Sequence, residues 1–250
     1  MIVVDRGKYF ECIPQHEHAR ISYEAAKRWA DVDMTREKSW NYVKLAVREH
    51  DCAWVILDAY PDYHNEKNAP YSFIDYPLEK KLNAYREGIA YVCCLHPYSG
   101  LLCSLHYSSF FRGSSDDRGK SFRQEEIKRQ KDIRNRVDTQ HEDEHLLILQ
   151  FCDDLSLYAC LNKPGAMKEE EITWFRSGFR QTFSFLKNQT IKAAFSSENC
   201  IQWNPFPFTE PFQIVIRGSA VDKKKIETIG WNRAYKSSKP MERNFRFVSN

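Results

Sequence analysis

Hydrophobic residues recur at helical spacing in five stretches of the chain. In the central one, from Trp40 to Leu57, the apolar positions Val43, Ala46 and Val47 follow the 3.6-residue period of an amphipathic helix. The same spacing predicts further helices over residues 15–32, 78–96, 101–111 and 145–162. Residues from 15 to about 188 are therefore expected to form a mainly helical domain.

The two ends of the chain alternate between apolar and polar residues instead. Residues 2–13 alternate around Arg6-Gly7-Lys8, which predicts a short hairpin. Strand-like stretches resume after residue 188, at residues 190–197, 200–203, 212–221 and 244–249. The predicted fold class is mainly α, with an N-terminal β-hairpin and a small antiparallel β portion at the C-terminus, α+β overall. We expect the helical domain with its hairpin to span residues 1–188, and the β-rich portion, residues 189–250, to pack on it in one compact unit. The N-terminal hairpin is expected to join the sheet of that portion.

Two segments outside the apolar helices bear on function. Residues 58–77 contain three prolines and several aromatic residues, so we expect a loop that roofs a pocket and lines it with Tyr and Phe. Residues 112–145 carry charges of both signs, which is typical of a solvated helical face. His141 and His145 are expected to face solvent because their neighbours are polar and acidic.

Composition and charge argue against several classes of protein. A net charge of +3 is too balanced for nucleic-acid binding through bulk charge. No apolar run approaches the roughly 20 residues of a membrane-spanning helix, and the N-terminus lacks a secretory signal. The eight cysteines lie mostly in apolar stretches and form no CxxC pair, which indicates reduced thiols in a cytoplasmic protein.

Histidines and aspartates inside apolar stretches are the candidate functional residues. His50 and Asp51 lie near the end of the central helix, His106 lies among leucines, and Asp153-Asp154 interrupts an apolar helix. Buried imidazoles and carboxylates need partners, and one divalent metal centre would satisfy all of them. The alternative for the His50-Asp51 pair is a capped helix end with a hydrogen-bonded histidine.

One more histidine near the start of the chain is a candidate for the same centre. His16 and His18 are two residues apart on a predicted helix and point about 200° from each other. At most one of them can therefore face the core, and the spacing alone does not choose between them.

The candidate residues also carry a resemblance. His18, His50-Asp51, His106 and Asp153 resemble the ordered H…HD…H…D ligand series of the HD-domain superfamily. More closely, nearly the whole chain resembles an uncharacterised bacterial family of the DUF3891 type. The motifs that carry this likeness are QHEHARIS, HDCAW followed by Asp58 and Pro61, YSGLLCSLHYSSF, LQFCDDLSL and NPFPF.

The superfamily resemblance implies a ligand set and a role for each residue. It implies that His18, His50, Asp51 and Asp153 bind a divalent ion, which can be Mn, Fe, Zn, Ni or Mg. His106 would be a further ligand or a proton donor, and Asp58 would orient the ligands. An offset of one residue, from Asp153 to Asp154, is left open.

The activity implied by this resemblance is metal-dependent hydrolysis of a small phosphoester or nucleotide. Basic residues of the charged segment could attract such an anionic substrate, namely Arg112, Arg118, Lys120 and Arg123. Two other classes stay open. One is a di-iron oxygenase, for which His96 and Glu17 are the only spare ligands, and the other is a non-catalytic binding module with a structural His/Asp centre.

Overall fold

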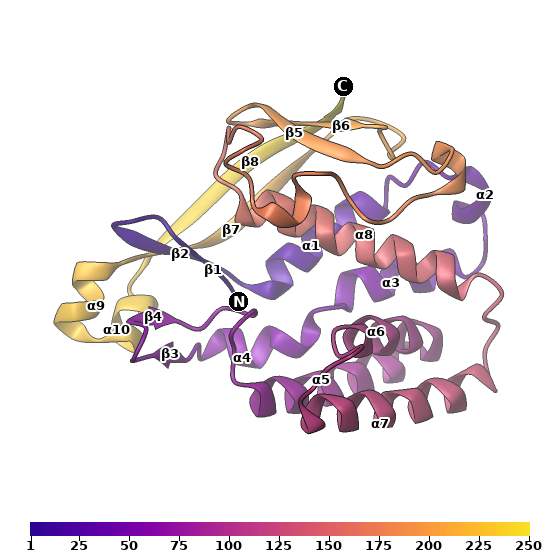
Figure 1. The fold of residues 1–250 in the computed structure, drawn as a ribbon, viewed down its shortest axis with the longest axis horizontal. Helices are drawn as coiled ribbons and strands as arrows, with labels where there is room; N and C mark the ends of the chain where they lie inside the picture. The colour runs from indigo at the N-terminus through magenta and orange to yellow at the C-terminus, as the bar shows by residue number, and fades with distance from the viewer.

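The computed structural model describes residues 1–250 and shows a layer of helices with a strongly curved sheet along one side (Figure 1). The helices are α1 (Gln15–Ala26), α2 (Val32–Thr35), α3 (Trp40–Glu49), α4 (Val55–Ala59), α5 (Leu78–Leu95), α6 (Pro97–Ser109), α7 (Asp117–Arg134), α8 (Glu142–Leu161), α9 (Lys223–Ile229) and α10 (Trp231–Lys236). None of them combines the length and the apolar content that crossing a bilayer requires.

The strands form one large sheet and one small one. The strands are β1 (Ile2–Asp5), β2 (Tyr9–Ile13), β3 (Tyr63–His64), β4 (Ala69–Pro70), β5 (Lys192–Ser197), β6 (Cys200–Asn204), β7 (Phe212–Asp222) and β8 (Lys239–Ser249). The six-stranded sheet has the order β1-β2-β7-β8-β6-β5, and β3 pairs only with β4. All neighbours in the large sheet are antiparallel except β6 and β8, which are parallel.

The predicted fold class is therefore wrong. Helices, including three short 3-10 helices, make up 49% of the chain, and the strands are not a small antiparallel appendage but a six-stranded mixed sheet. The hairpin was expected to join the C-terminal sheet, and Phe10 on β2 does pair with Val221 on β7. The size of the sheet and the parallel pairing of β6 with β8 were not expected. Local alternation identifies strands but carries no information on such distant pairing. The division of the chain at residue 188 stays a prediction.

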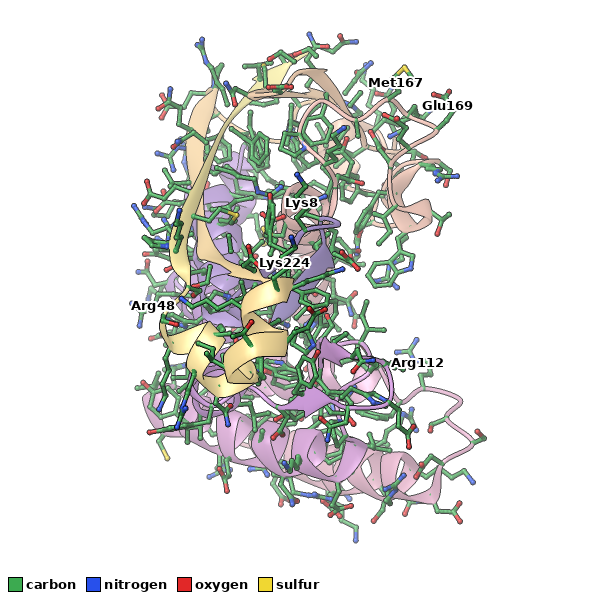
Figure 2. All side chains as sticks on the ribbon, turned by 90° about the vertical axis from the view of Figure 1, so that its left-hand side faces the viewer. Lys8, Arg48, Arg112, Met167, Glu169 and Lys224 are labelled. Carbon is green, nitrogen blue, oxygen red and sulfur yellow. The ribbon has the colours of Figure 1, made fainter.

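Side chains of the sheet and of the helices share one core. Trp203 on β6 is fully buried, and its ring lies 6.3 Å from that of Phe151 on α8 and 5.2 Å from that of Phe247 on β8. Burying one large apolar side chain contributes about 1.5–3 kcal/mol, so this contact fixes the sheet on α8. At the far end of the sheet, α9 with Lys224 lies beside the β1–β2 turn with Lys8 (Figure 2).

Local sequence explains how the helices that carry the candidate residues are placed. Pro97 cannot continue α5, and it starts α6 after His96 adopts an extended conformation. At Gly100 an added Cβ would lie 2.7 Å from Cys93 Cα, so only glycine lets α6 approach α5 this closely. On its other side, α6 packs against α3, which also contacts α1 and α8.

Candidate metal centre

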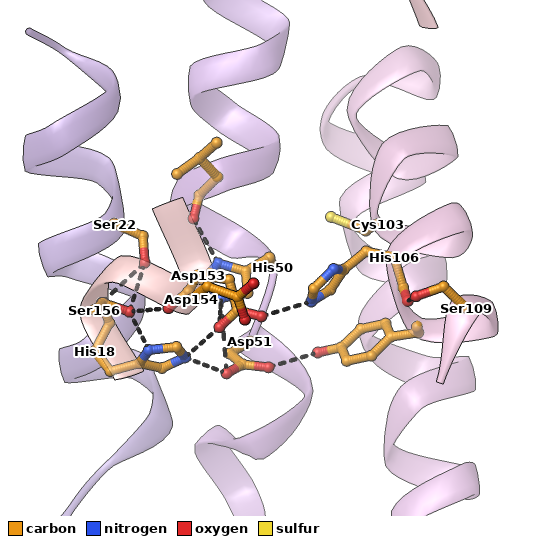
Figure 3. Close-up of polar contacts among 12 residues, drawn as sticks. His18, Ser22, His50, Asp51, Cys103, His106, Ser109, Asp153, Asp154 and Ser156 are labelled. Carbon is orange, nitrogen blue, oxygen red and sulfur yellow. Dashed lines mark hydrogen bonds and ion pairs between the residues drawn. The ribbon is translucent and has the colours of Figure 1, made fainter. Parts of the chain in front are cut away.

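Five buried side chains from four packed helices meet inside the helical layer (Figure 3). They are His18 on α1, His50 and Asp51 at the C-terminal end of α3, His106 on α6 and Asp153 on α8. The structure thus brings together all five residues that were singled out as candidate ligands. It also resolves the choice in α1, where His18 is fully buried and His16 is exposed.

The nitrogen and oxygen atoms of these side chains are spaced like metal ligands. His18 Nε2 lies 2.7 Å from Asp51 Oδ2, and His50 Nε2 lies 3.5 Å from Asp153 Oδ1. His106 Nε2 lies 3.4 Å from the other oxygen, Asp153 Oδ2. Adjacent ligands that are each about 2.1 Å from one ion are separated by about 3.0–3.4 Å in octahedral or tetrahedral coordination. Two sets of three ligand atoms each lie within 4.8 Å of one another, and they share His50.

Hydrogen bonds set the protonation of two of the three imidazoles. His50 Nδ1–H donates to the Val47 carbonyl at 2.7 Å, which leaves the buried Nε2 without a hydrogen-bond partner. Ser156 donates its hydroxyl to the Asp153 carbonyl at 2.8 Å and therefore accepts from His18 Nδ1–H. Both imidazoles direct Nε2 into the cluster, and this is the tautomer that binds a metal when the Nδ1 proton is held elsewhere.

The charges in the centre favour a cation. Burial opposes charge on His50, but the carboxylates of Asp51 and Asp153 raise its pKa to about 9. Burial lowers the pKa of His106 to about 4, although Asp153 opposes this. Burial raises the pKa values of Asp51 and Asp153, but the neighbouring imidazoles, mainly that of His50, lower them more. The pKa values of both carboxyl groups therefore lie below the ordinary value of aspartate. A proton on His50 supplies positive charge to the two carboxylates, and a divalent ion can take its place.

Asp51 is held by further groups outside the cluster. Gln15 donates its side-chain amide to Asp51 Oδ2 at 3.1 Å, and the Tyr107 hydroxyl donates to Asp51 Oδ1 at 3.3 Å. Asp58 makes no hydrogen bond to the five central residues. It accepts from the Gln15 backbone N–H at 2.7 Å and from the amino group of Met1, so it acts on Asp51 only through Gln15.

The directions of the two adjacent aspartate side chains show which one belongs to the centre. Asp153 faces the three histidines, whereas Asp154 accepts from the Gln181 side chain at 2.8 Å and from Arg180 Nη2 at 3.3 Å. Burial, together with the charge of Asp153, raises the pKa of Asp154 to about 6. Asp154 therefore lies beside the centre but turns toward the segment that follows α8.

A cavity of about 480 Å³ opens onto the centre. Asp51, His106 and Asp153 lie on its wall, and the rest of the wall is mainly aromatic. The aromatic side chains are Trp54, Phe73, Tyr85, Phe110, Trp174, Phe175 and Phe179. The only cationic side chain on the wall is Arg180, which is 77% exposed. The cavity thus combines a polar floor, flat apolar walls and one positive charge.

The walls come only in part from the loop that was expected to form them. Phe73 is the one residue of the 58–77 loop on the cavity wall, and Tyr76 packs against Trp54 instead, with ring centroids 5.4 Å apart. The remaining roof comes from the irregular segment after α8, on whose outer edge Met167 and Glu169 lie (Figure 2). This segment has no regular hydrophobic period from which its place could be predicted, although its cluster of Trp174, Phe175, Phe179 and Arg180 is a compositional signal of a buried wall.

The basic residues of the charged segment do not line the cavity. Arg118 pairs with Asp116 at 2.7 Å, and Lys120 pairs with Asp117 at the same distance. Arg112 projects from the surface of the helical layer (Figure 2). Arg180 is therefore the side chain best placed to meet an anion at the cavity.

The prediction that His145 faces solvent is wrong. Its side chain is 1% exposed, because it lies on the same face of α8 as Ile148, Leu149 and Cys152. Polar neighbours in the sequence suggested a surface position, but the helical period decides which side of α8 it occupies. The two spare ligands proposed for a di-iron site also lie elsewhere. His96 stacks on Tyr42, and Glu17 pairs with Arg20.

Comparison with known proteins gives one match. No curated protein and no solved structure matches the chain. The family model described as "Protein of unknown function (DUF3891)" matches residues 1–223, which include the complete His/Asp centre. The chain therefore belongs to the DUF3891 family.

Proposed function

We propose that the His/Asp centre binds a divalent metal ion and hydrolyses a small phosphoester, such as a nucleotide. The observation that carries this proposal is the convergence of three imidazoles and two carboxylates on the floor of a cavity, with the buried Nε2 of His50 lacking any hydrogen-bond partner. Buried polar atoms without partners are rare in proteins, and this nitrogen fits a ligand of an ion. The H…HD…H…D order of these residues, similar to that of the HD-domain superfamily, is a second support.

The donor set suits several ions. His18, His50, Asp51 and Asp153 would hold the metal through nitrogen and oxygen atoms, a mixture that Mn, Fe, Zn, Ni and Mg accept to different degrees. Once bound, such an ion lowers the pKa of a water molecule and polarises a phosphoryl oxygen. His106 fits a further ligand better than a proton donor, because its lowered pKa keeps the imidazole neutral near pH 7.

The cavity supports a substrate with a charged end and a flat apolar body. Arg180 and the centre can hold the anionic group from two sides. Aromatic side chains such as Trp54 and Phe179 can stack on a ring. A volume of about 480 Å³ is within the range of small-ligand sites and suits a mononucleotide better than a polymer.

The two other classes remain as outcomes of the test. A di-iron oxygenase needs ligands for a second iron, and neither His96 nor Glu17 is available for this purpose. A non-catalytic module would keep the centre as a structural or ligand-binding site without turnover.

The test combines metal analysis with an activity panel. Protein purified without chelator or affinity metal is analysed for metal content and absorbance, and then assayed with nucleotides and generic phosphoesters plus added Mn, Mg, Ni or Fe. Asp51→Ala should lose both bound metal and turnover. The matched control is Asp62→Ala, which removes a partly exposed carboxylate paired with Lys80 outside the centre. Equal turnover in wild type and Asp51→Ala, or none with any ion, would refute the hydrolase, and two irons per chain would favour the oxygenase.

A further inference from the structure

A second group of histidines and carboxylates lies toward the start of α8, separate from the centre. His145 precedes Asp153 by two helical turns, which places the two residues about 12 Å apart along α8. His141 precedes His145 by one turn, and Glu37 comes from the turn between α2 and α3. The three residues line a cavity of about 640 Å³ that is distinct from the one at the centre.

Both histidines present the same ring nitrogen to one carboxylate. His141 Nε2 lies 3.1 Å from Glu37 Oε1, and His145 Nε2 lies 3.8 Å from Glu37 Oε2. The second distance is too long for a hydrogen bond, and His145 Nε2 is buried with no hydrogen-bond partner at all. A polar atom in this position is costly unless a further group binds it.

The other ring nitrogen of each histidine is held from outside. His145 Nδ1 lies 2.6 Å from the Tyr98 hydroxyl, and His141 Nδ1 lies 3.0 Å from Glu144 Oε2. A metal-bound histidine characteristically gives its second N–H to a hydroxyl, carbonyl or carboxylate, which fixes the ring and raises the basicity of the ligating nitrogen. The same arrangement on two neighbouring histidines is not needed for packing alone.

We propose that His141, His145 and Glu37 form a second divalent metal site, with the preferences of Zn²⁺. Two imidazoles and one carboxylate are a common zinc ligand set that leaves a fourth position for water or a small ligand. The three ligand atoms do not all lie within 4.8 Å of one another, unlike those of the centre. Binding must therefore draw Glu37 and His141 inward, and their side chains, 28% and 32% exposed, have the freedom to turn.

The position of the site gives the ion a structural task. Glu37 lies three residues before the start of α3, and His50 and Asp51 follow the end of that helix. His145 lies on α8, which carries Asp153. A metal at this position would connect the starts of two helices whose later residues form the centre. The inference does not depend on the proposed hydrolysis, because it concerns different residues and a different cavity.

The experiment is a zinc titration of the metal-free full-length chain against a chromophoric chelator, with Asp51→Ala used to remove central binding. Glu37→Gln and His141→Ala change partly exposed side chains and should leave the fold intact. Each should lower the zinc affinity of the proposed second site by more than about 100-fold, because the loss of a direct ligand exceeds the 10–100-fold effect of losing a residue that only holds a ligand. Glu144→Ala, which removes only the hydrogen-bond partner of His141 Nδ1, should weaken zinc binding at this site by about 10-fold.

A matched control and a second readout complete the design. Asp143→Asn neutralises an exposed carboxylate in the same turn of α8 and should leave zinc binding unchanged. Zinc should raise the Tm of Asp51→Ala but not that of the double variant Asp51→Ala/His141→Ala. The proposal is overturned if Asp51→Ala binds no zinc, or if Glu37→Gln and His141→Ala bind zinc as tightly as the parent chain does.

Discussion

Replacing Ser156 by alanine tests how the centre is organised. Ser156 Oγ accepts the Nδ1 proton of His18 and donates to the Asp153 carbonyl, so it fixes the tautomer that directs His18 Nε2 at Asp51. In Ser156→Ala the fully buried His18 Nδ1–H loses its acceptor, which should cost about 1–3 kcal/mol of stability in the metal-free chain. Removal of such an outer partner should also weaken metal binding by about 10–100-fold, or about 1.4–2.7 kcal/mol.

The assay is metal affinity by competition with a chelator, combined with urea unfolding in excess chelator. Ser22→Ala is the matched control, because the Ser22 hydroxyl donates to Ser156 Oγ at 2.9 Å but does not touch the imidazole. We expect Ser22→Ala to change metal affinity by less than about 3-fold, since Ser156 can still accept from His18. If Ser156→Ala binds metal as tightly as wild type, or if both variants weaken it equally, the assigned tautomer and the role of Ser156 are wrong.

Three further results are expected. In excess chelator, the free energy of unfolding should fall by about 3 kcal/mol as the pH rises from about 6.5 through 9. The reason is that the pKa of His50 in the folded chain is raised to about 9, so its proton stabilises the fold only below that pH. A free energy of unfolding that does not change over this range would contradict the prediction. Glu11→Gln should cost about 3–5 kcal/mol in urea unfolding, since Glu11 is buried and pairs with Arg243 of β8 at 2.8 Å, whereas a loss below about 1 kcal/mol would argue against this contact between β2 and β8. Arg180→Ala should raise the KM for an anionic substrate by about 10-fold with little change in kcat or Tm, because Arg180 is exposed at the cavity; an unchanged KM would place the substrate elsewhere.

Helices and strands could largely be predicted from local pattern, and so could the joining of the N-terminal hairpin to the C-terminal sheet, but the size and strand order of that sheet could not. The apolar periods of α5, α6 and α8 marked these helices to within a few residues. The strand β8 is longer than the stretch identified at residues 244–249, because its first half, Lys239 to Arg243, is polar and mostly exposed. Pairing partners lie far apart in the sequence, so the six-stranded sheet depends on contacts that no short window contains.

The candidate site shows a similar division. His50, Asp51 and His106 could be identified because charge-bearing groups in apolar helices require partners. The roof with Trp174 and Arg180 was missed, since irregular segments are positioned by tertiary packing and have no periodic signature. A sequence can therefore identify the floor of such a cavity more readily than the segment that covers it.

The place of β8 in the sheet has a consequence for biosynthesis. On the ribosome, β1, β2 and β7 can pair with one another, and β5 can pair with β6, as soon as they emerge. These two parts have no ladder in common until residues 239–249 are made and β8 inserts between β7 and β6. Until then the nascent chain exposes the edges of β7 and β6 that β8 will cover, and such unpaired edges are templates for aggregation. Chaperone demand during translation should therefore be greatest just before β8 leaves the exit tunnel.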